Sequence, residues 1–154
     1  MKGNGFSLIE LLVVVLIIGI LAAVAAANYG VLVEKVYSAR VMTLGHAVRH
    51  AAERYYYVQG HYPVEKNHLD ITWKCPEGFK CIWREDGISK ITFRRTGKYT
   101  IIFSFIRREP PYTNMTYCVA PKGDKYRNKL CKAVAGNGED ISPNDKMYSR
   151  YRIK

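Results

Sequence analysis

The feature that most constrains this chain is an apolar run near its N-terminus that contains a single acid. Residues 6–27 hold only one ionisable side chain, that of Glu10. About 20 apolar residues in a helix, at ~1.5 Å each, cross a hydrocarbon layer of ~30 Å, so the run predicts a membrane-spanning helix. A charged side chain near the centre of a membrane costs roughly 2.5–3.5 kcal/mol or more, so we expect Glu10 to have a partner and a purpose.

The residues before the run indicate how the chain is inserted. Lys2 and the amino terminus are the only charges upstream of Phe6. Positive charge stays in the cytoplasm, so we expect the rest of the chain to be exported into an oxidising compartment. A secretory signal peptide has its small residues after the apolar core, whereas here Gly3 and Gly5 precede it.

Gly5, Phe6 and Glu10, followed by the apolar helix, resemble the type III signal of the type IV pilin family, which includes the pseudopilins of type II secretion. The resemblance implies that a prepilin peptidase cuts between Gly5 and Phe6, removes a leader of residues 1–5 and methylates the new amino terminus at Phe6. It also implies that Glu10 meets this amine on a neighbouring subunit and thereby sets the axial step of a growing filament.

Electrostatics agrees with this assembly role for Glu10. Cleavage creates a cation four residues before the acid, about one helical turn away. Two opposite charges ~4 Å apart gain several-fold more in a low dielectric than the ~1 kcal/mol that they gain in water. Glu10 has two alternative roles: it could form an ion pair within its own chain, or its carboxylate could reach the membrane interface.

The helix should stay intact beyond the membrane span. Many pilins have a proline at the position of Ala27, but residues 22–27 are five Ala and one Val, and Ala is the best helix former. We therefore expect any break in a filament at residues 28–30, and we assign helix flexibility to Gly19 and Gly30, because each Gly costs about 1 kcal/mol relative to Ala.

Residues 29–59 continue the rod with an amphipathic pattern. Apolar residues recur at steps of three and four, whereas charged side chains that include Glu34 and Glu53 fall between them. The apolar positions are Val33, Tyr37, Val41, Leu44, Val48, Ala51, Tyr55 and Val58. Residues 6–28 thus form the transmembrane or filament-core helix, and residues 29–59 are expected to pack on a head.

The remaining residues, 60–154, predict one globular α+β head. Residues 88–95 and 99–107 suggest a hairpin around the turn 95–98, and Trp73 with 79–84 and 115–120 suggest two more short strands. Residues 124–135 suggest a helix capped by Asp124 and stopped by Gly136, and 146–153 a last strand. The fold class is α+β, a long N-terminal helix packed on a C-terminal antiparallel sheet, as in the pilin fold.

Four cysteines suit a small exported head. Three pairings exist, and we favour Cys75 with Cys81 and Cys118 with Cys131. The second pair is similar to the C-terminal disulfide loop of many pilins. Zinc is the rival interpretation, but the intervals between these cysteines do not match the usual spacing of zinc ligands.

A net charge of +11 and a pI near 9.6 suggest an anionic partner. Tyrosines interleave with basic residues and could stack on bases, so DNA or another polyanion is a hypothetical ligand of the head. The alternatives are a solvated face or complementary charge between subunits. The candidate anion-binding residues are Lys90, Arg94, Arg95, Lys98, Arg107 and Arg108.

Other candidate sites are weak. His46 and His50 lie four residues apart on a helix but lack a third metal ligand, so no metal site is assigned. No nucleophile with a base, no pair of acids and no phosphate-binding glycine loop stands out, so we expect neither an enzyme nor a cofactor.

We therefore expect the major structural subunit of a type IV pilus. The monomer would lie in the bacterial inner membrane, and an assembly machinery would polymerise it into an extracellular helical homopolymer for adhesion, motility or DNA uptake. One alternative is a pseudopilin of a type II secretion system. Another, of a different class, is a membrane-anchored anion-binding module that never polymerises.

Overall fold

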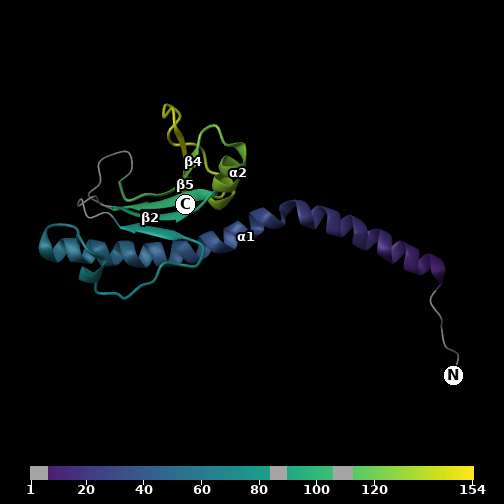
Figure 1. Ribbon diagram of the computed structural model, residues 1–154, viewed down its shortest axis with the longest axis horizontal. Coiled ribbons are helices and arrows are strands. Elements are labelled where there is room, and N and C mark those ends of the chain that lie inside the picture. The colour runs from purple at the N-terminus through teal and green to yellow at the C-terminus, as the bar shows by residue number, and fades with distance from the viewer. Residues whose placement is uncertain (1–6, 84–89, 106–112) are drawn as a thin grey trace, which may run out of the picture. The chain divides into compact units, whose positions relative to one another are not determined.

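A computed structural model describes residues 7–83, 90–105 and 113–154 of the chain. Figure 1 shows a long helix and a β-sheet head. The chain divides into two compact units, one ending at Val33 and one formed by Glu34–Lys154. The elements are α1 (Leu8–Gln59), a 3-10 turn (Lys66–His68), β1 (Lys80–Trp83), β2 (Lys90–Arg95), β3 (Tyr99–Ser104), β4 (Thr116–Pro121), α2 (Lys125–Val134) and β5 (Tyr148–Ile153).

The described part of the first unit is a helix with a largely apolar surface. Helix α1 starts with a capping box, in which the Ser7 backbone N–H donates to Glu10 Oε2 at 2.8 Å. The helix then runs without a break through Gly19 and Gly30, and a Cβ added at either glycine would meet nothing within 4 Å. By length and composition, Leu8–Ala26 can span a membrane, with a mean hydropathy of 3.1.

The second unit holds a five-stranded antiparallel sheet in the chain order β1-β2-β3-β4-β5. Each strand pairs with the next, and the turn between β2 and β3 contains Gly97 at φ 74°. A positive φ suits glycine, which has no Cβ to clash. The α+β class with a long N-terminal helix and an antiparallel sheet is therefore confirmed.

Two strand predictions need correction. Trp73 lies in an irregular segment, because the chain next turns through the Cys75–Cys81 loop, with Gly78 at φ 77°. Strand β3 ends at Ser104, short of the predicted Arg107, and there the Ser104 hydroxyl donates to the Met115 carbonyl at 2.8 Å. The predicted strand start at 88, the residues 106 and 107, and the predicted Pro110-Pro111 loop lie outside the described residues.

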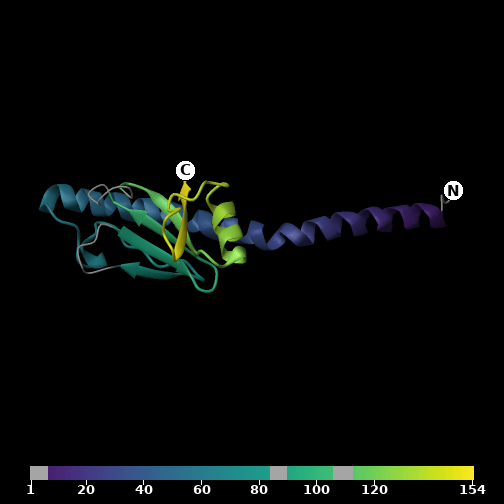
Figure 2. The ribbon, with the colours of Figure 1, turned by 90° about the horizontal axis from the view of Figure 1, so that it is seen from above.

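The inner face of the sheet packs against α1, and Figures 1 and 2 show the later part of α1 along the sheet. The buried residues of α1 form a stripe with steps of four and three. They are more polar and smaller than predicted. Val58, predicted to be on this face, is 79% exposed, whereas Glu34 and Glu53 are buried. The stripe consists of Glu34, Ser38, Val41, Gly45, Val48 and Ala52.

Aromatic side chains of the sheet explain why this stripe holds small residues. A Cβ added to Gly45 would lie 2.2 Å from the ring of Phe103, and the His46 ring meets Phe103 edge to face at 5.3 Å. Phe103 in turn packs edge to face on Phe93 at 5.6 Å. Bulky rings on one surface therefore require small residues on the other, and a simple apolar pattern misses such positions.

Helix α2 is fixed to the same sheet. Asp124 caps it by accepting from the Arg127 N–H at 3.0 Å, and Gly136, at φ 69°, follows its C-terminus. The Cys118–Cys131 disulfide joins β4 to α2, with Cα atoms 5.6 Å apart. Cys75 and Cys81 form the second disulfide, so the structure contains the pairing that the sequence favours.

Candidate functional site

The N-terminal helix is the first candidate site, because its apolar surface has no cover within the first unit. Every side chain described between Ser7 and Gly30 is exposed. Among the described residues, the only hydrogen bond to the Glu10 carboxylate comes from the Ser7 N–H. This bond directs the carboxylate toward the N-terminal end of the helix. Gly5 and Phe6 themselves lie outside the described residues.

The second candidate site is a buried charge cluster that the sequence analysis missed. Glu34 is 1% exposed and lies on the buried stripe of α1. Arg95 donates to it through Nε at 3.1 Å and through Nη2 at 3.3 Å, and Lys98 Nζ forms a short contact with Glu34 Oε1. The Tyr99 hydroxyl completes the cluster by donating to Glu34 at 3.2 Å.

The surroundings of Glu34 favour its ionised form. Burial alone raises the pKa of a carboxyl, but the hydrogen bonds from Arg95 and Lys98 outweigh it, and the pKa of Glu34 is lowered. Burial and the nearby Glu34 carboxylate raise the pKa of the Tyr99 hydroxyl, which therefore stays protonated. The Arg95 guanidinium also lies 3.9 Å from the centre of the Tyr37 ring, so it is held from several sides.

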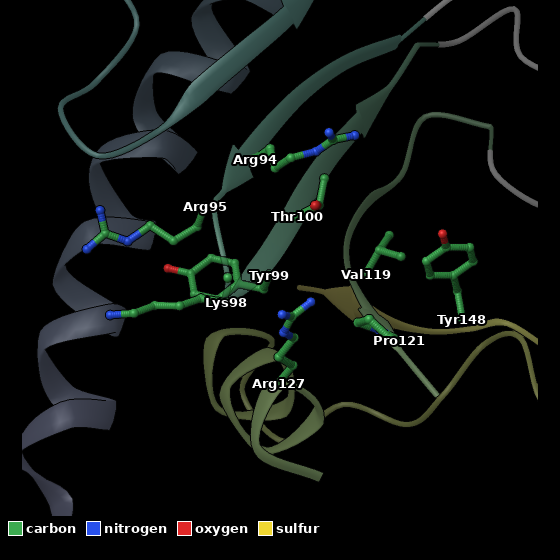
Figure 3. A pocket seen from close by; sticks show the side chains of 10 residues that line it. Arg94, Arg95, Lys98, Tyr99, Thr100, Val119, Pro121, Arg127 and Tyr148 are labelled. Atoms are coloured by element: carbon green, nitrogen blue, oxygen red, sulfur yellow. The ribbon is translucent and has the colours of Figure 1, made fainter. Parts of the chain in front are cut away.

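The predicted anion-binding set does not form one surface. Side chains alternate between the two faces of a strand, so Arg94 and Arg95 point to opposite faces of the sheet. Figure 3 shows Arg95 and Lys98 extending toward α1, while Arg94 extends away from it. Glu34 thus binds both Arg95 and Lys98. Lys90 and Arg94 lie on the outer face of the sheet. Arg107 and Arg108 lie outside the described residues.

A groove on the outer face of the sheet is the third candidate site. One hollow, of about 300 Å³, lies where β2, β3, β4 and the start of α2 meet. A second, of about 590 Å³, continues over the outer face and shares Arg94, Thr100, Val119 and Tyr148 with the first. We call the shared residues, together with Lys90 and Arg150, the outer groove.

The histidines do not build a metal site in the described part of the chain. Burial and the nearby Arg49 lower the pKa of His46, whose Nδ1 contacts Arg49 Nη2 at 3.1 Å. His50 Nδ1 lies 3.6 Å from Glu53 Oε2. Within residues 7–83, 90–105 and 113–154, no group of three or more His, Cys, Asp or Glu side chains is placed to hold a metal ion.

Comparison with known proteins identifies the N-terminal segment. Residues 1–26 match the family model of the prokaryotic N-terminal methylation motif. No curated protein and no solved structure gives a significant match. The matched segment contains Gly5, Phe6 and Glu10 and continues into the exposed apolar helix. The chain thus carries the type III prepilin signal of the type IV pilin and pseudopilin superfamily on a pilin-like α+β architecture.

Proposed function

We propose that the chain is the major structural subunit of a type IV pilus. The observation that carries this proposal is the exposed apolar helix Leu8–Ala26 with a single acid in its first turn. Such a surface needs lipid around the monomer, and neighbouring copies of the helix can replace that lipid in a filament. The role is structural, and force, adhesion or DNA uptake would belong to the filament and its motor.

Glu10 would connect processing to assembly. Prepilin peptidase would cut between Gly5 and Phe6 on the cytoplasmic side and methylate Phe6. The new cation would then lie near membrane depth, where it strongly attracts a carboxylate. In the filament, Glu10 of one subunit would pair with the Phe6 amine of its neighbour, while Gly19 and Gly30 would allow the helix to adjust.

A charge-removing variant in the native host tests this function. Glu10→Gln should be cleaved and methylated as usual, which mass spectrometry of the mature chain can establish, but it should give no extracellular filaments. Glu65→Gln, at an exposed position of the head, is the matched control and should assemble normally. Normal filament yield from Glu10→Gln would contradict the assembly role.

Electron microscopy separates the proposal from its alternatives. Extracellular filaments built of this chain would support a pilus. Periplasmic filaments, together with a secretion defect on deletion, would indicate a pseudopilin. A processed chain that stays monomeric in the inner membrane under all conditions would indicate an anchored binding module.

A further inference from the structure

The outer groove has the charge and the surface of an anion-binding site. Lys90 and Arg94 lie on the outer face of β2, and Arg150 lies on the outer face of β5. Arg127 adds a guanidinium at the α2 end. Figure 3 shows Arg94 and Arg127 directed toward the space beside Thr100, Val119 and Tyr148.

The spacing of these charges suits a polymer better than a small anion. Four residues along a strand separate Lys90 from Arg94, so their Cα atoms lie about 13 Å apart. This distance exceeds the ~3.4 Å axial rise per nucleotide of a duplex strand several-fold. The two cations can therefore meet different phosphates of one chain.

Arg94 is the best-placed cation for an outside partner. Among the described residues it has no ion pair or hydrogen bond to an acid, and it is exposed. By contrast, Arg127 pairs with Asp124 at 3.0 Å and Arg150 pairs with Asp145. The ligand would compete with carboxylates at Arg127 and Arg150 but not at Arg94.

A second copy of this chain is a poor occupant of the groove. Four acids of the head already pair with bases of their own chain, namely Glu34, Asp70, Asp124 and Asp145, and the chain has 24 Lys and Arg against 13 Asp and Glu. The net charge of +11 makes two copies repel each other at long range. Charge complementarity therefore indicates a polyanion.

The groove floor selects among polyanions. Thr100, Ile102 and Val119 form a floor of hydroxyl and apolar groups, and the Tyr148 ring beside it is 40% exposed. Unpaired bases can enter such a hollow and stack on an exposed ring. A duplex keeps its bases paired and offers only phosphates, and an acidic polysaccharide has no aromatic base to stack.

We propose that the outer groove binds single-stranded nucleic acid. Arg94 and Lys90 contact different, non-adjacent phosphates of one strand, and Tyr148 stacks on a base. The proposal involves only the head, so it does not depend on the proposed filament function.

The test uses the full chain in neutral detergent with fluorescent oligothymidine, and anisotropy is recorded over a range of salt concentrations. Binding should weaken with salt, with a slope of about −0.7 in log K against log salt for each phosphate contact. Arg94→Gln should make this slope less negative by about 0.7. Lys129→Gln, which removes one exposed charge from α2, should leave both slope and affinity unchanged.

The stacking claim has its own variants. Tyr148→Leu should weaken binding roughly five- to 150-fold, whereas Tyr148→Phe should keep the affinity. Equal losses for Arg94→Gln and Lys129→Gln would overturn the site and leave only diffuse charge. Duplex DNA or a sulfated polysaccharide that binds as tightly as the single strand would overturn the choice of ligand, and unchanged binding by Tyr148→Leu would overturn the stacking.

Discussion

Helix α1 carries Glu10 in the first unit and Glu34 in the second, and these two acids differ in what surrounds them. Glu10 lies among exposed apolar side chains, and its carboxylate accepts a backbone N–H. Glu34 is buried and meets Arg95, Lys98 and Tyr99 of the same head. The head thus supplies counter-charges for its own acid, whereas the described part of the first unit supplies none for Glu10. The proposed pairing of Glu10 with a neighbouring subunit requires a carboxylate that its own chain leaves without a counter-charge.

The largest expected effect on stability comes from removing the buried carboxylate of Glu34. Glu34→Ala leaves Arg95 and Lys98 without their carboxylate in a poorly solvated site, and breaking a buried ion pair costs about 3–5 kcal/mol. We expect a drop of this size in the free energy of unfolding. Denaturant titration in neutral detergent, followed through the fluorescence of Trp73 and Trp83, measures it. Glu65→Ala is the exposed control, and equal behaviour of the two variants would show that the cluster adds no stability.

The next effect compares a glycine of each unit. Gly45→Val would push a side chain into the Phe103 ring, and overpacking of this kind costs about 1–3 kcal/mol. Gly30→Val meets nothing within 4 Å, so it should leave the unfolding of the head unchanged. The same titration compares both variants. A stable Gly45→Val head would mean that the sheet and α1 can separate to make room.

A smaller effect concerns pH. The pKa of Glu34 is lowered in the folded head, so its contribution to stability is fully present above the unfolded pKa, ordinarily 4.5, and is lost as the pH falls through the folded pKa. Backbone hydrogen bonds from Tyr148 and Met147 lower the pKa of Asp145 to about 2, so its contribution is lost between the ordinary pKa of 3.8 and about 2. The free energy of unfolding, measured by denaturant titration at decreasing pH, should fall less steeply for Glu34→Gln than for the wild type. An equally steep fall for the variant and the wild type would contradict the ionised state of Glu34.

The smallest effect should be that of Glu10 on the head. Glu10→Ala changes an exposed side chain outside the second unit, so we expect the free energy of unfolding of the head to change by less than about 0.5 kcal/mol. The titration used for Glu34→Ala measures this as well. A large loss of stability would mean that assembly defects of Glu10 variants reflect misfolding, and the comparison between the two acids would fail.

Much of the fold follows from local patterns in the sequence. The apolar run predicts the first part of α1, Asp124 and Gly136 mark the ends of α2, and the turn at Gly97 marks the hairpin. These features depend on neighbouring residues, which is why they can be read one segment at a time. The end of β3 was predicted less well: the strand ends at Ser104, whose hydroxyl bonds to Met115, and a partner eleven positions away does not appear in a local pattern.

The candidate sites were only partly predictable. Strict alternation along β2 predicts that Arg94 and Arg95 lie on opposite faces, so the basic cluster of the sequence does not correspond to one surface. Glu34 also carried a signal, because it precedes Ser38 by four residues and Val41 by seven and so shares their helical face. A charged residue is normally predicted to face solvent. The cations that stabilise Glu34 in the core lie 61 and 64 positions further along the chain, so a local pattern does not reveal them.

The sequence by itself determined the N-terminal methylation motif, the membrane-compatible helix and the strongly basic character of the head. Each of these is a property of consecutive residues or of the sum of all residues. Only the tertiary structure decided which charges are engaged. Arg95 and Lys98 turn toward Glu34 and Arg94 turns outward, because strand register and the packing of α1 on the inner face fix which side of the sheet each base occupies.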